Sequence, residues 1–164
     1  MKKLSVIIPS YNYADVLGRA VNSIPDTDEI EILIIDDGSP DNTEEIASEL
    51  VNQRNNLKYI KKENGGAASA RNRGIKEATG EYLFFLDADD EASDNAFEKI
   101  LDLIKKQNPE LIIGEHISIS PDGKQKVHKT IPLSNNPEER LKLYFEKKNP
   151  HHARIFRSKK ILLR

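Results

Sequence analysis

The chain has 164 residues, a length typical of one domain and sufficient for a hydrophobic core without covalent cross-links. It contains no cysteine, which excludes disulfides, thiolate nucleophiles and cysteine-ligated zinc. Basic and acidic residues nearly balance (25 against 27), which favours a folded soluble domain over a disordered polyelectrolyte. No apolar run approaches the ~20 residues of a membrane span, and the run at residues 4–8 is too short for a signal peptide. We therefore expect a cytoplasmic protein.

Positive charge gathers near the C-terminal end of the chain. Residues 140–164 hold nine Lys or Arg residues and one acid, Glu146. A solvated surface that a longer chain would cover explains this pattern. Contact with an anionic partner, such as phospholipid headgroups at the inner face of the membrane, explains it as well. We expect no nucleic-acid partner.

Apolar runs of strand length alternate with helical patterns in the first two thirds of the chain. The runs predict strands at residues 4–8, 30–35, 57–60, 82–86 and 111–113. Apolar residues three and four positions apart predict helices at residues 16–24, 41–51, 67–78 and 97–104. The last of these helices is expected to have Ser93 or Asp94 as its cap. This alternation indicates an α/β fold with a mostly parallel sheet covered by helices on both faces.

The pattern changes beyond Gly114. Alternating residues at 116–120 and 127–131, on either side of a Pro-Asp-Gly turn, predict a β-hairpin. Asn136 and Pro137 predict the start of a further helix, and residues 154–157 predict a short strand.

Polar residues follow the first two strands, where a parallel sheet binds its ligands. Pro9, Ser10, Tyr11 and Asn12 end the first strand. The Tyr11 ring either stacks on a flat ligand or is a partly buried loop aromatic. The pair Asp36 and Asp37 ends the second strand. Backbone amides of the turn would satisfy these carboxylates, or one of them would accept hydrogen bonds from a base or a ribose.

The Ala-rich helix at residues 67–78 is preceded by Asn64, Gly65 and Gly66. Glycines permit a close backbone approach, and a helix N-terminus favours anions. Arg71 and Arg73 lie within the first two turns, where both can contact phosphate. The alternative is a flexible loop beside exposed arginines.

The strongest signal follows the strand at residues 82–86. Asp87, Asp89, Asp90 and Glu91 place four acids within five residues, with no basic residue among them. Such carboxylates repel one another, and a divalent cation relieves the repulsion. Hard oxygen ligands suit Mg²⁺ or Mn²⁺, whose other positions are filled by water and substrate phosphate. An acidic turn at the start of the next helix is the alternative.

These candidates fit one ligand, which contains a planar base, a ribose, a diphosphate and a divalent cation. Four blocks then resemble family 2 glycosyltransferases of the GT-A fold, in the expected order and spacing. They are SVIIPSYN (5–12), DDGS (36–39), NGG (64–66) with ARNRG (70–74), and GEY (80–82) with LDADD (86–90). The resemblance fades beyond residue 115, although residues 154–157 look like the segment before the family's acceptor-side region.

The resemblance implies a UDP-sugar donor and a role for each matching residue. Pro9 and Tyr11 would frame the base, with Ser10 and Asn12 beside them, and Asp37 would hydrogen-bond the base next to Asp36. Arg71 would lie near the nucleotide. In the family's DxD motif, Asp87 would lie near the ribose, followed by Ala88, and Asp89 would ligate Mn²⁺ or Mg²⁺. Asp90 would shape the sugar pocket. The usual chemistry is inverting transfer to a glycan, lipid-linked or cell-surface polysaccharide acceptor.

The sequence departs from the family in one respect. The carboxylate base follows the acceptor-side strand, and this chain ends before such a motif; Glu138 and Glu139 come too early, and His116 does not suit the role. We therefore expect a single GT-A domain truncated at its C-terminus, with a nucleotide-sugar-binding half at residues 1–115 and the start of an acceptor-side half at 116–164. Such a fragment would bind donor yet transfer sugar poorly.

Two other functions stay open. A nucleotide-binding module without transferase activity is compatible with the missing base. A nucleotidyltransferase also uses this type of sheet with a metal, but it carries a Gly-rich phosphate loop soon after its first strand, and residues 10–13 are not such a loop.

Overall fold

A computed structural model describes residues 1–128 of the chain and, as backbone alone, residues 154–157. The described residues divide into two compact units: one extends to residue 112 and takes in most of the last strand, and the other holds the hairpin. The predicted helix at Asn136 lies outside the described residues. None of the helices in the described part of the chain combines the length and the apolar character that a membrane crossing requires.

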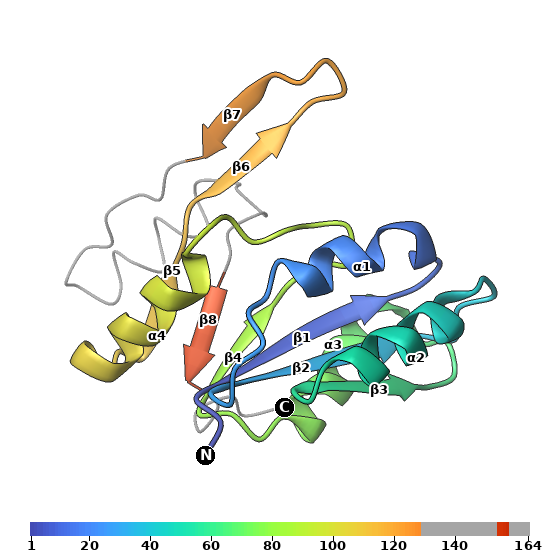
Figure 1. The fold of residues 1–164 in the computed structure, drawn as a ribbon, viewed down its shortest axis with the longest axis horizontal. Helices are drawn as coiled ribbons and strands as arrows, with labels where there is room; N and C mark the ends of the chain where they lie inside the picture. The colour runs from blue at the N-terminus through green and yellow to red at the C-terminus, as the bar shows by residue number, and fades with distance from the viewer. Residues whose placement is uncertain (129–153, 158–164) are drawn as a thin grey trace. The chain divides into compact units, whose positions relative to one another are not determined.

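The first unit is built around a six-stranded sheet in the order β3-β2-β1-β4-β8-β5 (Figure 1). Its strands are β1 (Leu4–Ser10), β2 (Ile30–Asp36), β3 (Leu57–Lys61), β4 (Tyr82–Phe85), β5 (Leu111–Ile113) and β8 (Arg154–Arg157). The strands β1 to β4 are parallel to their neighbours, and β8 runs antiparallel to β4. The expected mostly parallel sheet is therefore present.

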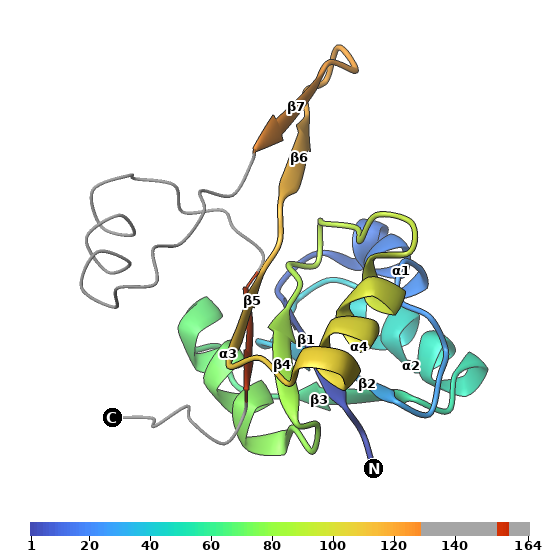
Figure 2. The same ribbon diagram turned by 90° about the vertical axis from the view of Figure 1, so that its left-hand side faces the viewer.

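Helices cover both faces of this sheet. They are α1 (Ala14–Asn22), α2 (Thr43–Gln53), α3 (Gly66–Glu77) and α4 (Ala96–Gln107). Figure 2 shows α3 on one face and α1, α2 and α4 on the other. Every residue of β1 and β2 is buried, because central strands between two helical layers have no solvent-facing side. On the face of α4, Phe97 meets Phe84 edge-on, with ring centroids 5.8 Å apart.

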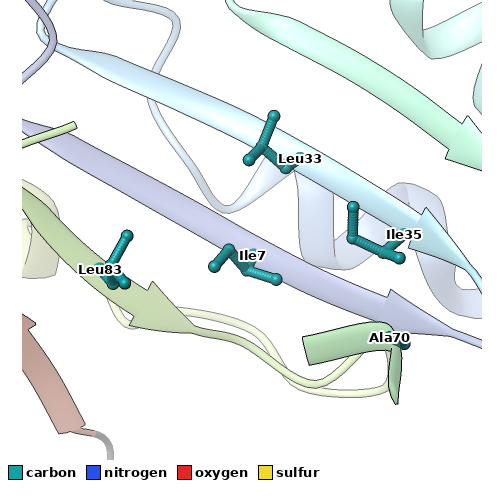
Figure 3. Packing of buried hydrophobic residues seen from close by; sticks show 5 residues of the cluster. All are labelled: Ile7, Leu33, Ile35, Ala70 and Leu83. Atoms are coloured by element: carbon teal, nitrogen blue, oxygen red, sulfur yellow. The ribbon is translucent and has the colours of Figure 1, made fainter. Parts of the chain in front are cut away.

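The core on the α3 side fixes how close this helix lies to the sheet. Ile7, Leu33, Ile35 and Leu83 pack from three neighbouring strands against Ala70 of the helix (Figure 3). One turn further on, a Cβ at Gly74 would lie 2.3 Å from Cγ2 of Ile7. The absence of a side chain at residue 74 therefore lets the helix backbone touch β1.

One expectation about helix starts was wrong. The helix α4 begins at Ala96, and Asn95 rather than Ser93 or Asp94 occupies the N-cap position. Asn95 has a left-handed backbone (φ 58°), which asparagine tolerates better than most residues do. This conformation turns the chain just before the helix, so the helix starts later than the acidic pattern indicates.

The second unit contains the predicted hairpin. Its strands β6 (His116–Ile119) and β7 (Gln125–His128) pair antiparallel, with His116 opposite His128. The two imidazole rings stack with centroids 4.2 Å apart.

Candidate active site

The exits of three strands meet at one edge of the sheet. The strand order reverses between β1 and β4, because β2 and β3 lie on one side of β1 and β4 lies on the other. Ligands of parallel α/β sheets bind outside such a reversal, at the carboxyl ends of the strands. The register pairs Ile7 with Phe85 and Pro9 with Ile35, so the strands end at similar heights. The predicted residues after β1, β2 and β4 are therefore neighbours.

Tyr11 and Asn12 form the accessible part of the β1 exit. The Tyr11 side chain lies at the surface, with 48% of the residue exposed. Asn12 has a left-handed backbone (φ 62°), and its N–H donates to Ser39 Oγ at 3.0 Å. This bond connects the exits of β1 and β2. The Tyr11 ring is thus free to contact a ligand over the sheet edge.

Three other predicted residues lie beneath this surface rather than on it. Pro9 and Ala88 are buried, and only 2% of Ser10 is exposed. Ser10 contributes its backbone carbonyl, which accepts the N–H of Asp37 at 2.9 Å. Its hydroxyl has no hydrogen-bond partner within the described part of the chain. These residues shape the floor of the candidate site.

Asp36 is wholly buried and engaged by the protein itself. Its Oδ1 accepts the N–H of Ser39 at 2.8 Å, and its Oδ2 accepts the Tyr59 hydroxyl at 2.6 Å. Burial raises the pKa of Tyr59, and this hydrogen bond to the carboxylate raises it further. Asp36 therefore fixes the turn after β2 against β3.

Asp37 joins the exit of β2 to the start of α3. Its carboxylate accepts the N–H of Gly66 at 2.6 Å and that of Gly65 at 3.0 Å, and it pairs with the Lys62 ammonium. Burial alone would raise the pKa of Asp37, but these hydrogen bonds outweigh it and lower the pKa below its ordinary value. The glycine loop is thus held by a buried, ionised carboxylate.

Arg71 and Asp87 meet across the site. Nη2 of Arg71 lies 2.6 Å from Oδ1 of Asp87, which links the second turn of α3 to the exit of β4. Both side chains keep substantial exposure, 36% and 52% respectively. Arg73 does not join them, because its Nε donates to Glu77 at 2.8 Å on another side of the helix. Of the two arginines considered for phosphate, only Arg71 lies beside the acids.

The acidic segment after β4 is open to solvent. Asp87, Asp89 and Asp90 are exposed, and the N–H of Asp90 donates to the Asp87 carbonyl at 3.0 Å in a turn. Beyond this turn, the N–H of Ala92 donates to Ser23 Oγ at 3.0 Å and so anchors the segment to α1. The carboxylates are therefore displayed at the sheet edge.

The donor set was tested for a divalent metal. No group of three or more His, Cys, Asp or Glu side chains that could hold a metal occurs among the described residues. The Asp89 carboxylate makes no hydrogen bond or ion pair in the part of the chain that the structure describes. Two exposed carboxylates, Asp87 and Asp89, fit Mn²⁺ or Mg²⁺ only if the remaining ligands come from water and substrate phosphate, as is usual for these ions.

The sequence analysis missed two residues that organise the site. Lys62 follows the third strand, so the rule that directed attention to the other strand exits applies to it equally. Asp41 was interpreted only as a helix start. Its carboxylate accepts Thr43 Oγ1 at 2.6 Å and the N–H of Ala14 at 3.1 Å, which ties the start of α2 to that of α1. Burial opposes ionisation of Asp41, but its hydrogen bonds prevail and lower its pKa.

Comparison with known proteins gives a consistent result. The model of the family described as "Glycosyl transferase family 2" matches residues 5–163. The chain is 35% identical over 153 residues to the minor teichoic acid biosynthesis protein GgaB of Bacillus subtilis, covering 90% of this chain and 17% of that protein. It is 37% identical over 123 residues to the poly(ribitol-phosphate) β-N-acetylglucosaminyltransferase TarP of Staphylococcus aureus, covering 71% of this chain and 37% of that one.

A solved structure shares the fold. Residues 1–349 of S. aureus TarS, in complex with UDP-GlcNAc, superpose with a TM-score of 0.61 at 32% identity, over 66% of this chain and 33% of that one. This similarity confirms the expected fold class. The chain spans less than half the length of the relatives compared here.

Proposed function

The chain belongs to glycosyl transferase family 2, and we propose that it forms the nucleotide-sugar-binding part of an enzyme that transfers a sugar from a UDP-sugar to a cell-surface polymer. The observation that carries this proposal is the meeting of Tyr11, Arg71 and the exposed carboxylates of Asp87 and Asp89 at the strand-order reversal. The UDP-GlcNAc complex of TarS supports the choice of UDP.

In this proposal the uracil base stacks on Tyr11 and hydrogen-bonds Asp37. The Asp37 carboxylate already accepts from three groups: Lys62, Gly65 and Gly66. A carboxylate has about four lone-pair positions, so one donor of the base can still be accepted. Asn12 borders the base, whereas Pro9, Ser10, Asp36 and Ala88 support the site from below.

The acids and Arg71 would bind the rest of the donor. Asp87 lies near the ribose in this proposal, Asp89 holds Mn²⁺ or Mg²⁺ with help from Asp87, and Asp90 borders the sugar. The metal, when bound, neutralises charge on the departing diphosphate. Arg71 contributes a fixed positive charge to the same phosphates, since its guanidinium has nitrogens beyond the one that contacts Asp87.

The acceptor is proposed from the relatives. GgaB is named for minor teichoic acid biosynthesis and TarP for poly(ribitol-phosphate). We therefore favour a phosphate-bearing polymer over a neutral glycan or a lipid-linked acceptor. The carboxylate that takes the proton of the attacking hydroxyl, in an inverting displacement, is assigned to chain beyond Arg164. Residues 1–115 serve as the donor-binding half, and contact of residues 140–164 with a membrane stays a prediction.

Calorimetry with UDP, GDP and UDP-GlcNAc, with and without Mn²⁺, tests the proposal. We expect the uridine nucleotides to bind more tightly than GDP and to gain affinity from the metal. Nucleotide binding by a full-length protein that transfers no sugar would favour the binding-module alternative. Failure of every nucleotide to bind would overturn the proposal.

A further inference from the structure

The outer flank of α3 carries a second polar site. Ser69, Asn72, Arg73 and Lys76 follow one another at three- and four-residue spacing, so they share one side of the helix. Together with Lys62 of the preceding loop they line a hollow of about 450 Å³, which we call the α3 groove.

This groove is separate from the strand exits where the donor is placed. Ala70 and Gly74 are the buried side of α3 and face the sheet. Arg71 points from another side of the helix to Asp87. The groove residues lie beyond both, on the flank nearest Lys62.

The charge of the groove is positive. Its lining has three basic side chains, two neutral polar ones and no acid. Lys76 makes no ion pair or hydrogen bond with any other described residue. Glu77 engages only Nε of Arg73, so the two terminal nitrogens of that guanidinium can bind an anion in fork geometry. A solvated helix face would carry mixed charges, whereas this lining offers donors alone.

The basic groups are spread along the groove rather than gathered at one point. A Cβ at Gly65 would lie 3.2 Å from Nζ of Lys62 and 2.8 Å from Oγ of Ser69, so these two donors flank the start of the helix. Lys76 lies seven residues beyond Ser69, a rise of about 10 Å along the axis. A single phosphate contacts one end, while an anion that repeats along a chain contacts both.

We propose that the α3 groove binds the backbone phosphates of the phosphodiester-linked acceptor polymer. This inference rests on the proposed function and adds a place on the chain for the acceptor. Lys62 connects the two sites, since its ammonium both lines the groove and pairs with Asp37 at the donor edge. An acceptor chain held here extends toward the strand exits.

The test compares two double variants with the same loss of charge. Arg73→Gln with Lys76→Gln removes two cations from the groove. Lys105→Gln with Lys106→Gln removes two cations from α4, where they pair with Glu29 and Asp102. The probe is a soluble poly(ribitol phosphate) oligomer, titrated by calorimetry at low salt, and UDP affinity is measured on the same samples.

We expect the groove variant to weaken oligomer binding by at least about fivefold, as expected for loss of exposed ion pairs, with UDP affinity unchanged. The α4 variant should bind the oligomer as the wild type does. Equal weakening in both variants, or none in the groove variant, would overturn the inference. So would equally tight binding of inorganic phosphate or of a DNA strand of equal charge. Failure of the wild type to bind UDP would instead contradict the proposed function.

Discussion

Arg71 on α3 and Asp87 after β4 are joined by a 2.6 Å ion pair. The pair connects a helix on one face of the sheet to a strand exit, and neither partner is deeply buried. An exposed ion pair contributes only about 0–1 kcal/mol to folding. Its value in the proposed enzyme is positional, because it keeps a cation and a carboxylate at the edge where the donor diphosphate would lie.

Replacing Arg71 by glutamine should therefore affect nucleotide binding more than stability. We expect UDP affinity to fall about tenfold or more, since a charge-assisted contact to phosphate is lost. The unfolding midpoint in urea should hardly change. The matched control is Arg19→Gln, which breaks the 3.4 Å pair with Glu91 at the far end of the acidic segment. An equal loss of UDP affinity in both variants would mean that general charge, not the position of Arg71, matters.

Asp89→Asn tests the proposed metal ligand. Asparagine keeps the size of the side chain but loses the negative charge that hard cations require. We expect the variant to bind UDP as weakly with Mn²⁺ as the wild type does without it. Asp94→Asn, which neutralises an exposed acid beyond the cluster, should retain the metal effect. Full metal-dependent affinity in Asp89→Asn, measured by calorimetry, would remove Asp89 from the metal site.

The fold was predictable because its strands are encoded locally. Runs such as residues 30–35 are apolar without alternation, which is typical of a strand with helices on both faces, and the structure has β2 there. Helix starts were less predictable: Asn95 turns the chain by a backbone conformation that no residue pattern specifies.

Within the site, sequence predicted which residues gather but not what they contact. Asp36 and Asp37 are adjacent in an acidic turn, yet one binds Tyr59 and the other Lys62 and the glycine loop. These partners follow from the alternation of side chains across the sheet together with the path of distant loops. The second of these is a tertiary property, so single-residue reasoning left both aspartates as candidates for the nucleotide.

The lowered pKa of Asp37 predicts how stability depends on pH. A carboxyl group whose pKa is lower in the folded state stabilises the fold fully above its unfolded value of about 3.9. That contribution is lost as the pH falls toward the folded pKa. Glu31 acts in the same direction: burial opposes its ionisation, but hydrogen bonds from Ser5, Thr79 and Gly80 lower its pKa. We expect urea midpoints to be steady near neutrality and to drop below about pH 4.

Asp37→Asn isolates the contribution of one carboxylate. The amide cannot accept from Lys62, Gly65 and Gly66 in the same way, and its NH₂ would face one of these donors. We expect a loss of about 1–3 kcal/mol at pH 7, with a shallower decline in acid than the wild type shows. An unchanged acid profile would show that the titration of Asp37 does not contribute to stability.

Gly74 provides the sharpest test of packing beneath the site. Alanine is favoured over glycine in a helix by about 1 kcal/mol, but here its Cβ would lie 2.3 Å from Cγ2 of the fully buried Ile7. Overpacking of this kind costs roughly 1–3 kcal/mol, so Gly74→Ala should destabilise the protein despite better helix propensity. Gly18→Ala in α1 is the matched control, because nothing lies within 4 Å of the added carbon. It should be neutral or stabilising in urea denaturation.

A double-mutant cycle separates the clash from other effects of the substitution. Ile7→Ala removes the methyl group that the new Cβ would meet, and alone it should cost about 2–5 kcal/mol through the cavity it leaves. Combined with Gly74→Ala, the total loss should be smaller than the sum of the two single losses, because the alanine methyl fills part of that cavity. Additive losses would mean that α3 does not contact β1 at this glycine. The placement of Arg71, one turn earlier on the same helix, would then need another cause.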